Sequence, residues 1–164
     1  MTRTDPAHAM VLHTPTKTKR AAALVALLVA LLLSSLLADA ITAPPAQATS
    51  PERQLMNMIN HTRSHRGLRR LKVGHRLVRL ARRHTASMSR TRTLFHSSGL
   101  ASKMRGSYWG ENVGYTRGGV RSIHRAFMRS SAHRSNILGG KFRRLGIGVA
   151  SSGGRMWVTE IFSS

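Results

Sequence analysis

The sequence predicts one α+β domain in which helices and a small sheet lie in layers. Three segments carry apolar residues at helical spacing, and three shorter segments have the composition and boundaries of β-strands. The last two strand-like segments follow each other through a short turn, while the earlier one lies between helices, an order typical of α+β folds. The chain of 164 residues is too short for two domains with separate cores.

The composition limits both the core and the chemistry of this domain. Hydrophobic residues make up 41% of the chain and aromatic residues 5%, so the core must be mostly aliphatic. Cysteine is absent, which excludes disulfide bonds, thiolate metal sites, a CxxC redox motif and a cysteine nucleophile. The formal net charge of +22 predicts attraction to anionic partners, and nucleic acid, anionic lipid and acidic cell-wall polymer all qualify.

The N-terminal segment has the three-part order of a secretory signal peptide. Basic residues at positions 17–20 precede an uncharged run at 21–38, which is followed by small-residue cleavage sites. We therefore expect residues 1–48 to be a signal peptide and spacer, and residues 49–164 to be a secreted, extracellular domain. The alternative is an uncleaved N-terminal helix that anchors the protein to a membrane, because the run is long enough to span a bilayer.

Caps and periodicity predict the first two helices of the domain. Ser50-Pro51-Glu52 has the chemistry of a helix start, since Ser accepts from free N–H groups, Pro is tolerated in the first turn and Glu opposes the dipole. Gly67 is expected to end this helix. A second amphipathic helix with a basic outer face is predicted over about 76–90. Residues 95–106 are rich in Ser and Gly and are expected to form a loop able to carry functional side chains.

The second half of the domain is predicted to hold one helix and three strands. Residues 108–115 are strand-like, and apolar residues at helical spacing predict a helix over about 120–130. Two further strand-like runs, 145–150 and 155–162, are joined by Ser151-Ser152-Gly153-Gly154. We therefore expect the last two strands to be antiparallel neighbours.

Four segments match, in sequence order, the motifs of a single family. They are Leu55 to Leu71, Phe95-His96-Ser97, Gly110-Glu111-Asn112-Val113 and Ser130 to Leu138. In this order and spacing they resemble the CAP superfamily, or SCP domain, which includes cysteine-rich secretory proteins, antigen 5 and pathogenesis-related class 1 proteins. The resemblance covers residues 53–162 and is greatest to the bacterial, cysteine-free type. It implies an α-β-α sandwich, an extracellular location and a shallow cleft lined by two His and one or two acidic residues.

Carried over residue by residue, the resemblance places His96, Glu111 and His133 in the cleft. A further acidic position of the family falls near Ser130 here, so one carboxylate of the fuller set is missing. Phe127 also stands where a Trp is usual. Two imidazoles and one carboxylate are the ligand set of an open zinc site, so a divalent metal such as zinc, held by these three residues, is one hypothesis for the cleft.

Two other interpretations of the same cleft remain open. In the first, Glu111 hydrogen-bonds one of the imidazoles, and the cluster holds elements of the fold together without catalysing a reaction. In the second, Ser97, Ser98 or Ser130 is a nucleophile with a His as base and Glu111 as orienter, as in serine hydrolases. The catalytic residues are therefore unknown, and the sequence contains no nucleophile elbow.

Glu160 is the last acid of the domain and lies in the final predicted strand. Strand alternation places its side chain on the same face as Val158 and Phe162. We expect Glu160 to lie at a sheet edge and to pair with an Arg, because an unpaired buried carboxylate is costly. The alternative is that it points into the cleft and supplies a second carboxylate.

The function that these features favour is a secreted binding module. Its cleft would take a lipid, glycan or cell-envelope ligand, including a small apolar ligand, and its basic surface would hold it to an anionic cell-wall polymer or membrane surface in a salt-dependent way. The alternative is a metal-dependent or serine-type extracellular hydrolase that uses the same cleft. Specific nucleic-acid binding is not expected, because no recognition motif is present and aromatic residues are few. We expect a monomer.

Overall fold

The computed structural model describes residues 49–104 and 108–164. These described residues belong to one compact unit. The predicted signal peptide and spacer, residues 1–48, lie outside the described residues and stay a prediction. The described elements, in chain order, are α2 (Pro51–Ser64), β1 (Lys72–Val73), α3 (His75–Thr91), the 3₁₀ turn η1 (Ala101–Lys103), β2 (Trp109–Thr116), α4 (Val120–Arg129), α5 (Ser131–Leu138), β3 (Arg144–Ser152) and β4 (Arg155–Ser163).

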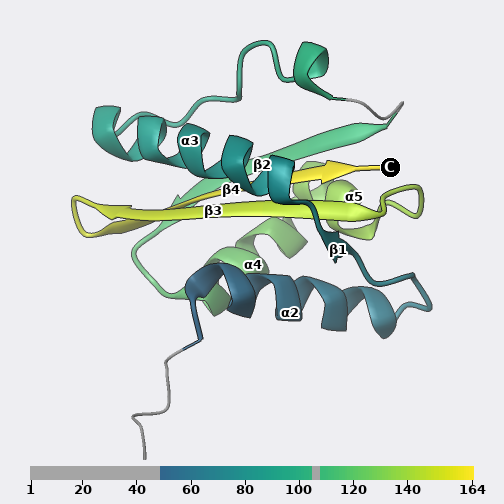
Figure 1. The fold of residues 1–164 in the computed structure, drawn as a ribbon. Helices are drawn as coiled ribbons and strands as arrows, with labels where there is room; N and C mark the ends of the chain where they lie inside the picture. The colour runs from purple at the N-terminus through teal and green to yellow at the C-terminus, as the bar shows by residue number, and fades with distance from the viewer. Residues whose placement is uncertain (1–48, 105–107) are drawn as a thin grey trace, which may run out of the picture. The chain divides into compact units, whose positions relative to one another are not determined.

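The four described strands form one mixed sheet in the order β1-β3-β4-β2 (Figure 1). β3 and β4 are antiparallel neighbours, and Gly153 and Gly154 form the turn between them with positive φ angles of 58° and 67°. This confirms the predicted hairpin, because such φ angles favour glycine. β2 also runs antiparallel to β4, whereas the short β1 runs parallel to β3. The sheet is therefore small and mostly antiparallel, as predicted, with β2 at one edge.

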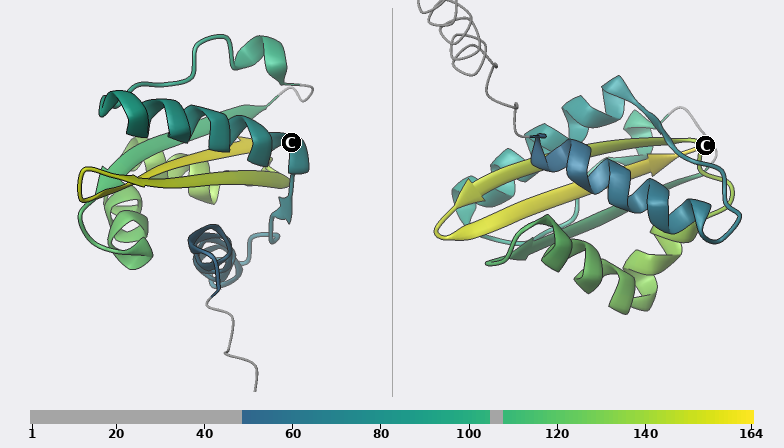
Figure 2. Two further views of the ribbon diagram at one scale, coloured as in Figure 1. Left: turned by 60° about the vertical axis from the view of Figure 1, so that its left-hand side comes forward. Right: turned by 90° about the horizontal axis from the view of Figure 1, so that it is seen from below.

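Helices cover both faces of the sheet and complete three layers (Figure 1 and Figure 2). α3 lies along one face, over β3 and β4, and η1 follows it on the same side. α2, α4 and α5 cover the opposite face, where α4 and α5 lie against β2 and α2 lies against β3. The predicted α-β-α sandwich is confirmed.

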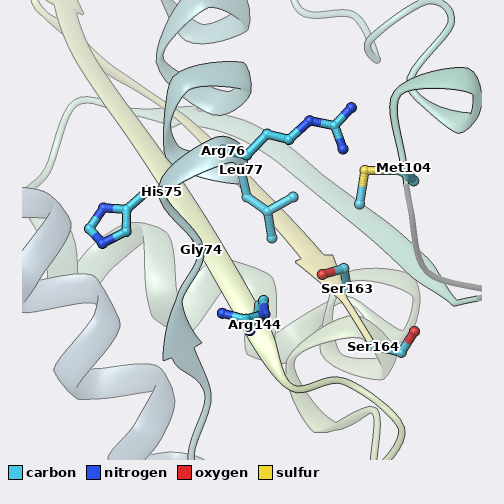
Figure 3. A pocket seen from close by; sticks show the side chains of 8 residues that line it. All are labelled: Gly74, His75, Arg76, Leu77, Met104, Arg144, Ser163 and Ser164. Carbon is cyan, nitrogen blue, oxygen red and sulfur yellow. The ribbon is translucent and has the colours of Figure 1, made fainter.

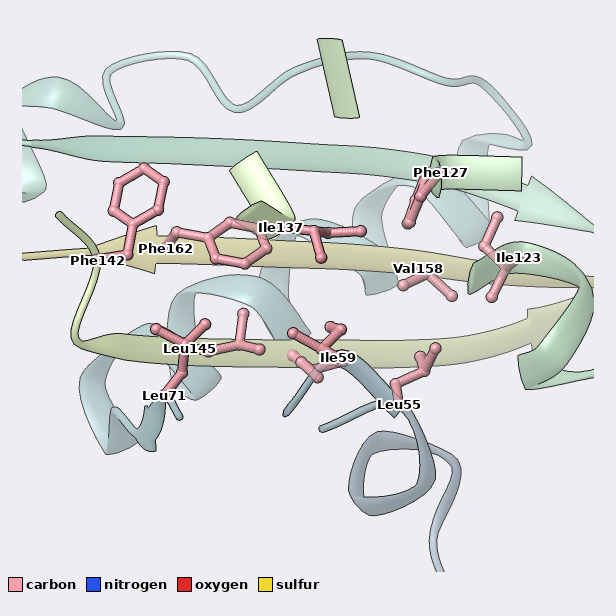
Figure 4. Close-up of a cluster of buried hydrophobic side chains, with 11 residues drawn as sticks. Leu55, Ile59, Leu71, Ile123, Phe127, Ile137, Phe142, Leu145, Val158 and Phe162 are labelled. Carbon is pink, nitrogen blue, oxygen red and sulfur yellow. The ribbon is translucent and has the colours of Figure 1, made fainter. Parts of the chain in front are cut away.

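The larger core fills the space between the sheet and the layer of α2, α4 and α5 (Figure 4). Its buried side chains are Leu55, Ile59, Leu71, Ile123, Phe127, Ile137, Phe142, Leu145, Ile147, Val158 and Phe162. Two smaller clusters lie beneath α3, and they include Ala81 and Trp157. Aliphatic side chains dominate the interior, which the low aromatic content predicts.

α3 packs directly on the backbone of β3 because two glycines of that strand face the helix. A Cβ on Gly146 would lie 2.2 Å from the backbone carbonyl carbon of Leu77, and a Cβ on Gly148 would lie 2.5 Å from that of Ala81. A side chain fits at neither position unless the helix moves. Glycines and apolar residues therefore alternate in β3 because its two faces differ: the glycines allow α3 to approach on one face, and Ile147 packs in the core on the other.

Three predicted helices are confirmed with small shifts, and three short elements were not predicted from the sequence. Ser50 caps α2 by accepting from the Arg53 N–H at 3.3 Å, but the helix ends at Ser64, and Gly67 follows in a turn with a φ of 65°. The elements without a predicted counterpart are β1, which has two residues, the three-residue turn η1, and α5. α5 buries a single residue, Ile137, so it carries no apolar stripe that periodicity could detect.

Candidate functional site

The three residues predicted to line a cleft, His96, Glu111 and His133, lie around the outer edge of β2. Side chains alternate along this strand, so Glu111 lies on the same face as Val113, which packs against Met88 of α3. Asn112, between them, faces the other layer, and its amide Nδ2 donates to the backbone carbonyl of His133 in α5 at 3.2 Å. The edge of β2 therefore carries Glu111 on its α3 side and His133 on its α5 side.

On the α3 side, the segment that follows α3 folds over Glu111. The His96 Nδ1 lies 2.8 Å from Glu111 Oε2, and the Ser97 N–H donates to the same oxygen at 3.0 Å. The Ser97 hydroxyl donates to the other oxygen, Oε1. The Glu111 side chain is 4% exposed, whereas that of His96 is 67% exposed. The buried carboxylate thus fixes an imidazole at the surface and leaves its Nε2 free of this contact.

On the α5 side, His133 lies in the first turn of the helix. Its ring stacks on Phe127 with the centroids 4.8 Å apart, and its Nδ1 lies 2.8 Å from Ser130 Oγ. Burial lowers the pKa of His133 below its ordinary value, the charge of His96 lowers it further, and a hydrogen bond with the backbone of Val113 partly offsets both effects. The charge of His96 therefore disfavours protonation of His133 across the edge of β2.

A buried amide network joins β2 to α5 and to the central strand β4. Asn112 Nδ2 donates to Glu160 Oε2 at 2.9 Å as well as to His133. Asn136 Nδ2 donates to Asn112 Oδ1 at 2.9 Å and to the backbone carbonyl of Glu111 at 3.2 Å. Asn136 is a residue of this network that was not predicted, although its position in the fourth motif is a signal that could have identified it.

Glu160 is buried inside the sheet, so the expectation that it pairs with an Arg at a sheet edge is wrong. Its strand lies between β3 and β2, and the residue is 0% exposed. Its Oε1 has no hydrogen-bond partner among the described residues. Burial raises the pKa of Glu160 to about 7, and the hydrogen bond from Asn112 partly offsets that shift. Glu160 touches the site through this amide and does not share the face of Glu111.

The arrangement does not assemble the three predicted metal ligands into a metal site. Within the described part of the chain, no group of three His, Cys, Asp or Glu side chains lies close enough to hold a metal ion. Both oxygens of Glu111 are already occupied, one by Ser97 and His96 and the other by the Ser97 hydroxyl. Among the described residues the three side chains therefore form no three-ligand group, and the metal hypothesis for His96, Glu111 and His133 stays a prediction.

The hydrogen bonds also divide the groups of the predicted serine hydrolase between two clusters. Ser97 donates to Glu111, whereas Ser130 pairs with His133. Among the described hydrogen bonds, Glu111 orients His96 and not the imidazole that Ser130 contacts. A nucleophile, its base and its orienter act through one continuous hydrogen-bond chain, and this arrangement does not supply one.

The surface of the domain is basic and has few carboxylates to balance the charge. Residues 49–164 hold 23 Lys and Arg against three Glu. Of these acids, Glu52 pairs with Arg82 at 3.2 Å, and Glu111 and Glu160 are buried. Exposed arginines lie on α3 and, across the sheet, on α4 and α5; they are Arg76, Arg79, Arg82, Arg83, Arg90, Arg121, Arg125, Arg129 and Arg134.

Several shallow hollows lie on this surface. One, at the beginning of α3, has a volume of about 320 Å³ and is lined by Arg76, Arg144 and Ser164, among others (Figure 3). A second, of about 260 Å³, lies between α3 and residues 95–103. A third, of about 330 Å³, lies between α2 and α3, where Met56 contributes to its lining.

The fold and the site together define a domain of the SCP class, a three-layer sandwich with a His and Glu cluster at the edge of its sheet. A family model described as "Cysteine-rich secretory protein family" (CAP) matches residues 56–162. The chain belongs to the CAP family. Its sequence contains no cysteine, so it is a cysteine-free member, as the motif resemblance predicts.

The similar proteins include bacterial relatives of the same type. The uncharacterized protein YkwD of Bacillus subtilis (strain 168) is 27% identical over 128 residues, which are 73% of this chain and 49% of that protein. The chain thus spans about half the length of this relative. An extracellular protein containing an SCP domain, from Bacillus anthracis str. Ames, has a TM-score of 0.61 at 22% identity, over 69% of this chain and 40% of that chain. The structure of NaASP2 with Zn²⁺ has a TM-score of 0.55 at 13% identity, over 73% and 83% of the two chains.

These comparisons support the fold and an extracellular family. The zinc ion belongs to the NaASP2 structure, and no cofactor follows from it for this chain. Among the described helices, none has the length and apolar character needed to cross a membrane. The secretory signal peptide and the alternative membrane anchor both concern residues 1–48, outside the described part of the chain, and stay predictions.

Proposed function

We propose that this protein is an extracellular binding module of the CAP family that attaches to an anionic cell-envelope polymer. The observation that carries the proposal is that the acidic residues of the domain are either paired or buried. Glu52 is paired, and Glu111 and Glu160 are buried, so the exposed Arg and Lys side chains have almost no carboxylates to neutralise them. Such a surface attracts polyanions over a distance that the salt concentration sets.

The distribution of the arginines favours a flexible polymer over a flat membrane. Exposed arginines lie on α3 in one layer and on α4 and α5 in the opposite layer. A planar surface contacts one of these layers at a time, whereas a chain polymer can follow both. Helices that bind membrane surfaces also insert an apolar face, and the apolar faces of α3 and α4 are already packed on the sheet.

The cluster of side chains at the outer edge of β2 adds polar and aromatic contacts for the same ligand. His96 is exposed and is held in place by Glu111. Trp109 and Tyr115 share the face of β2 that carries Glu111, and they are 43% and 44% exposed. Aromatic rings beside a few fixed hydrogen-bonding groups are typical of ligand sites, and they suit the sugar or polyol units of a polymer.

Binding of residues 49–164 to a poly(glycerol phosphate) teichoic acid at increasing NaCl concentration tests the proposal. We expect the logarithm of the binding constant to fall linearly with the logarithm of the salt concentration, since bound counterions are released. Two variants each lose three charges from one layer by Arg→Gln substitution: Arg76, Arg79 and Arg90 of α3, or Arg121, Arg125 and Arg129 of α4. Both should bind more weakly and depend less steeply on salt than the wild type.

The outcomes separate the alternatives. Comparable losses in the two variants support a polymer that contacts both layers. A loss in one variant only, with tighter binding to phosphatidylglycerol vesicles than to teichoic acid, indicates a membrane surface and contradicts the polymer. Double-stranded DNA bound as tightly as teichoic acid reduces the proposal to non-specific charge attraction, and binding that ignores salt refutes attachment by charge.

A further inference from the structure

The hollow between α3 and residues 95–103 brings together side chains that the cleft does not use. Its volume is about 260 Å³. α3 contributes Leu80, Arg83, His84 and Ser87 to its lining. The spacing of these residues, at i, i+3, i+4 and i+7, places them on one stripe of the helix. One wall of the hollow is therefore a rigid helical surface.

The polar groups around this hollow are hydrogen-bond donors, and an anion could accept their hydrogen bonds. Arg83 on α3 and Lys103 on η1 line it from its two walls, and both are exposed. Within the described residues, neither cation forms an ion pair. The hydroxyls of Ser87 and Ser98 add two further donors, and no carboxylate lines the hollow. Leu100, which is 3% exposed, provides a buried apolar part of the lining.

We propose that this hollow is a binding site for a phosphate ester, and that the phosphate groups of the anionic polymer are its ligand; this inference rests on the proposed function. A carboxylate has two oxygens, which a single guanidinium satisfies. A phosphate group offers more acceptor oxygens and a larger charge, so it uses two cations and two hydroxyls better. The apolar lining suits the carbon units that join neighbouring phosphates.

Ser97 connects this hollow to the cluster at the edge of β2. It lines the hollow, while its N–H and hydroxyl donate to the two oxygens of Glu111. The His84 Nε2 lies 2.8 Å from the Phe95 carbonyl, so α3 also holds the beginning of the same segment. A phosphate ester in the hollow contacts the segment that carries His96, and its binding changes the surroundings of that imidazole.

Titration of glycerol 3-phosphate into residues 49–164, followed by NMR of the imidazole protons, tests the site. The variant Arg83→Gln/Lys103→Gln removes both cations of the hollow, and the control Arg69→Gln/Arg70→Gln removes the same charge from the exposed segment between α2 and β1. We expect saturable one-site binding with a shift of the His96 resonances in the wild type and in the control. The variant at the hollow should bind about tenfold or more weakly.

The results distinguish failure of this site from failure of the proposed function. Equal weakening in both variants, or acetate that binds as tightly as glycerol 3-phosphate at the same ionic strength, overturns the phosphate site. Attachment to teichoic acid without glycerol 3-phosphate binding also overturns the site, but the proposed function then stands. Glycerol 3-phosphate binding without attachment to teichoic acid keeps the site and refutes the polymer as its source. If phosphatidylglycerol vesicles compete with glycerol 3-phosphate more strongly than teichoic acid does, the natural ligand is a lipid phosphate, and the polymer is refuted as its source.

Discussion

Replacing Glu160 by Gln should change the pH dependence of the protein's stability. Glu160 is fully buried in β4, it accepts one hydrogen bond from Asn112, and burial raises its pKa to about 7 from an ordinary value of 4.5. Between these two values the folded protein keeps a proton that the unfolded chain has released. The free energy of unfolding therefore falls as the pH rises from 4.5 to 7.

The two pKa values set the size of the effect. A difference of about 2.5 units, at about 1.36 kcal/mol per unit, gives about 3 kcal/mol of stability that is present below pH 4.5 and lost by pH 7. The Glu160→Gln variant has no titrating group at this position and escapes the loss. Its new amide N–H finds no acceptor where Oε1 lies, which costs about 1–3 kcal/mol. That cost is the same at every pH, so it cancels when the two proteins are compared across pH.

Urea unfolding of both proteins from about pH 4 to pH 8.5, followed by the fluorescence of the buried Trp157, measures this difference. We expect the free energy of unfolding of the variant, relative to the wild type, to rise by about 3 kcal/mol across this range. His124 and His133 titrate in both proteins and cancel. Glu52→Gln, which removes a surface acid, is the matched control and should show no comparable rise. A constant difference between Glu160→Gln and the wild type would refute the argument that Glu160 is buried without a compensating charge.

Three further predictions concern stability and metal binding. Arg63→Met should destabilise the fold by about 3 kcal/mol, because the buried guanidinium donates to three backbone carbonyls; urea unfolding measures this loss, and a change under about 1 kcal/mol contradicts it. Burial lowers the pKa of His124 below its ordinary value of 6.5, so its contribution to stability is lost as the pH falls below that value; in thermal unfolding, the stability of His124→Gln relative to the wild type should rise as the pH falls from about 7.5 to 5, and a constant difference contradicts the assignment. Calorimetric titration of zinc should show no saturable site that depends on Glu111 together with His96 and His133, since Glu111 already accepts from His96 and Ser97; one-site binding lost alike in Glu111→Gln, His96→Ala and His133→Ala would contradict this geometry.

Elements with an apolar stripe or a clear turn could be predicted from the sequence. α3 shows helical periodicity, and the two glycines after β3 mark the hairpin. The motif resemblance also identifies His96 and Glu111, which lie in direct contact. Local patterns do not predict the burial of Glu160. Strand alternation gives the face on which its side chain lies, but its burial depends on β4 being paired with β2 as well as with β3. That pairing joins residues about 50 positions apart, and no local period encodes it.

α5 shows why a helix that carries site residues can leave little trace in the sequence. Ile137 is its one buried residue, Leu138 is partly buried against the same core, the His133 ring stacks on Phe127, and hydrogen bonds add to these contacts. The Arg63 guanidinium donates to carbonyls at the end of this helix, and Asn136 donates to Asn112 in β2. Their partners come from distant parts of the chain, so periodicity cannot reveal them. Asn136 orients the Asn112 amide that donates to the His133 carbonyl, so Asn136→Leu should shift the NMR resonances of the His133 imidazole while the aliphatic core stays intact; unchanged resonances would contradict this.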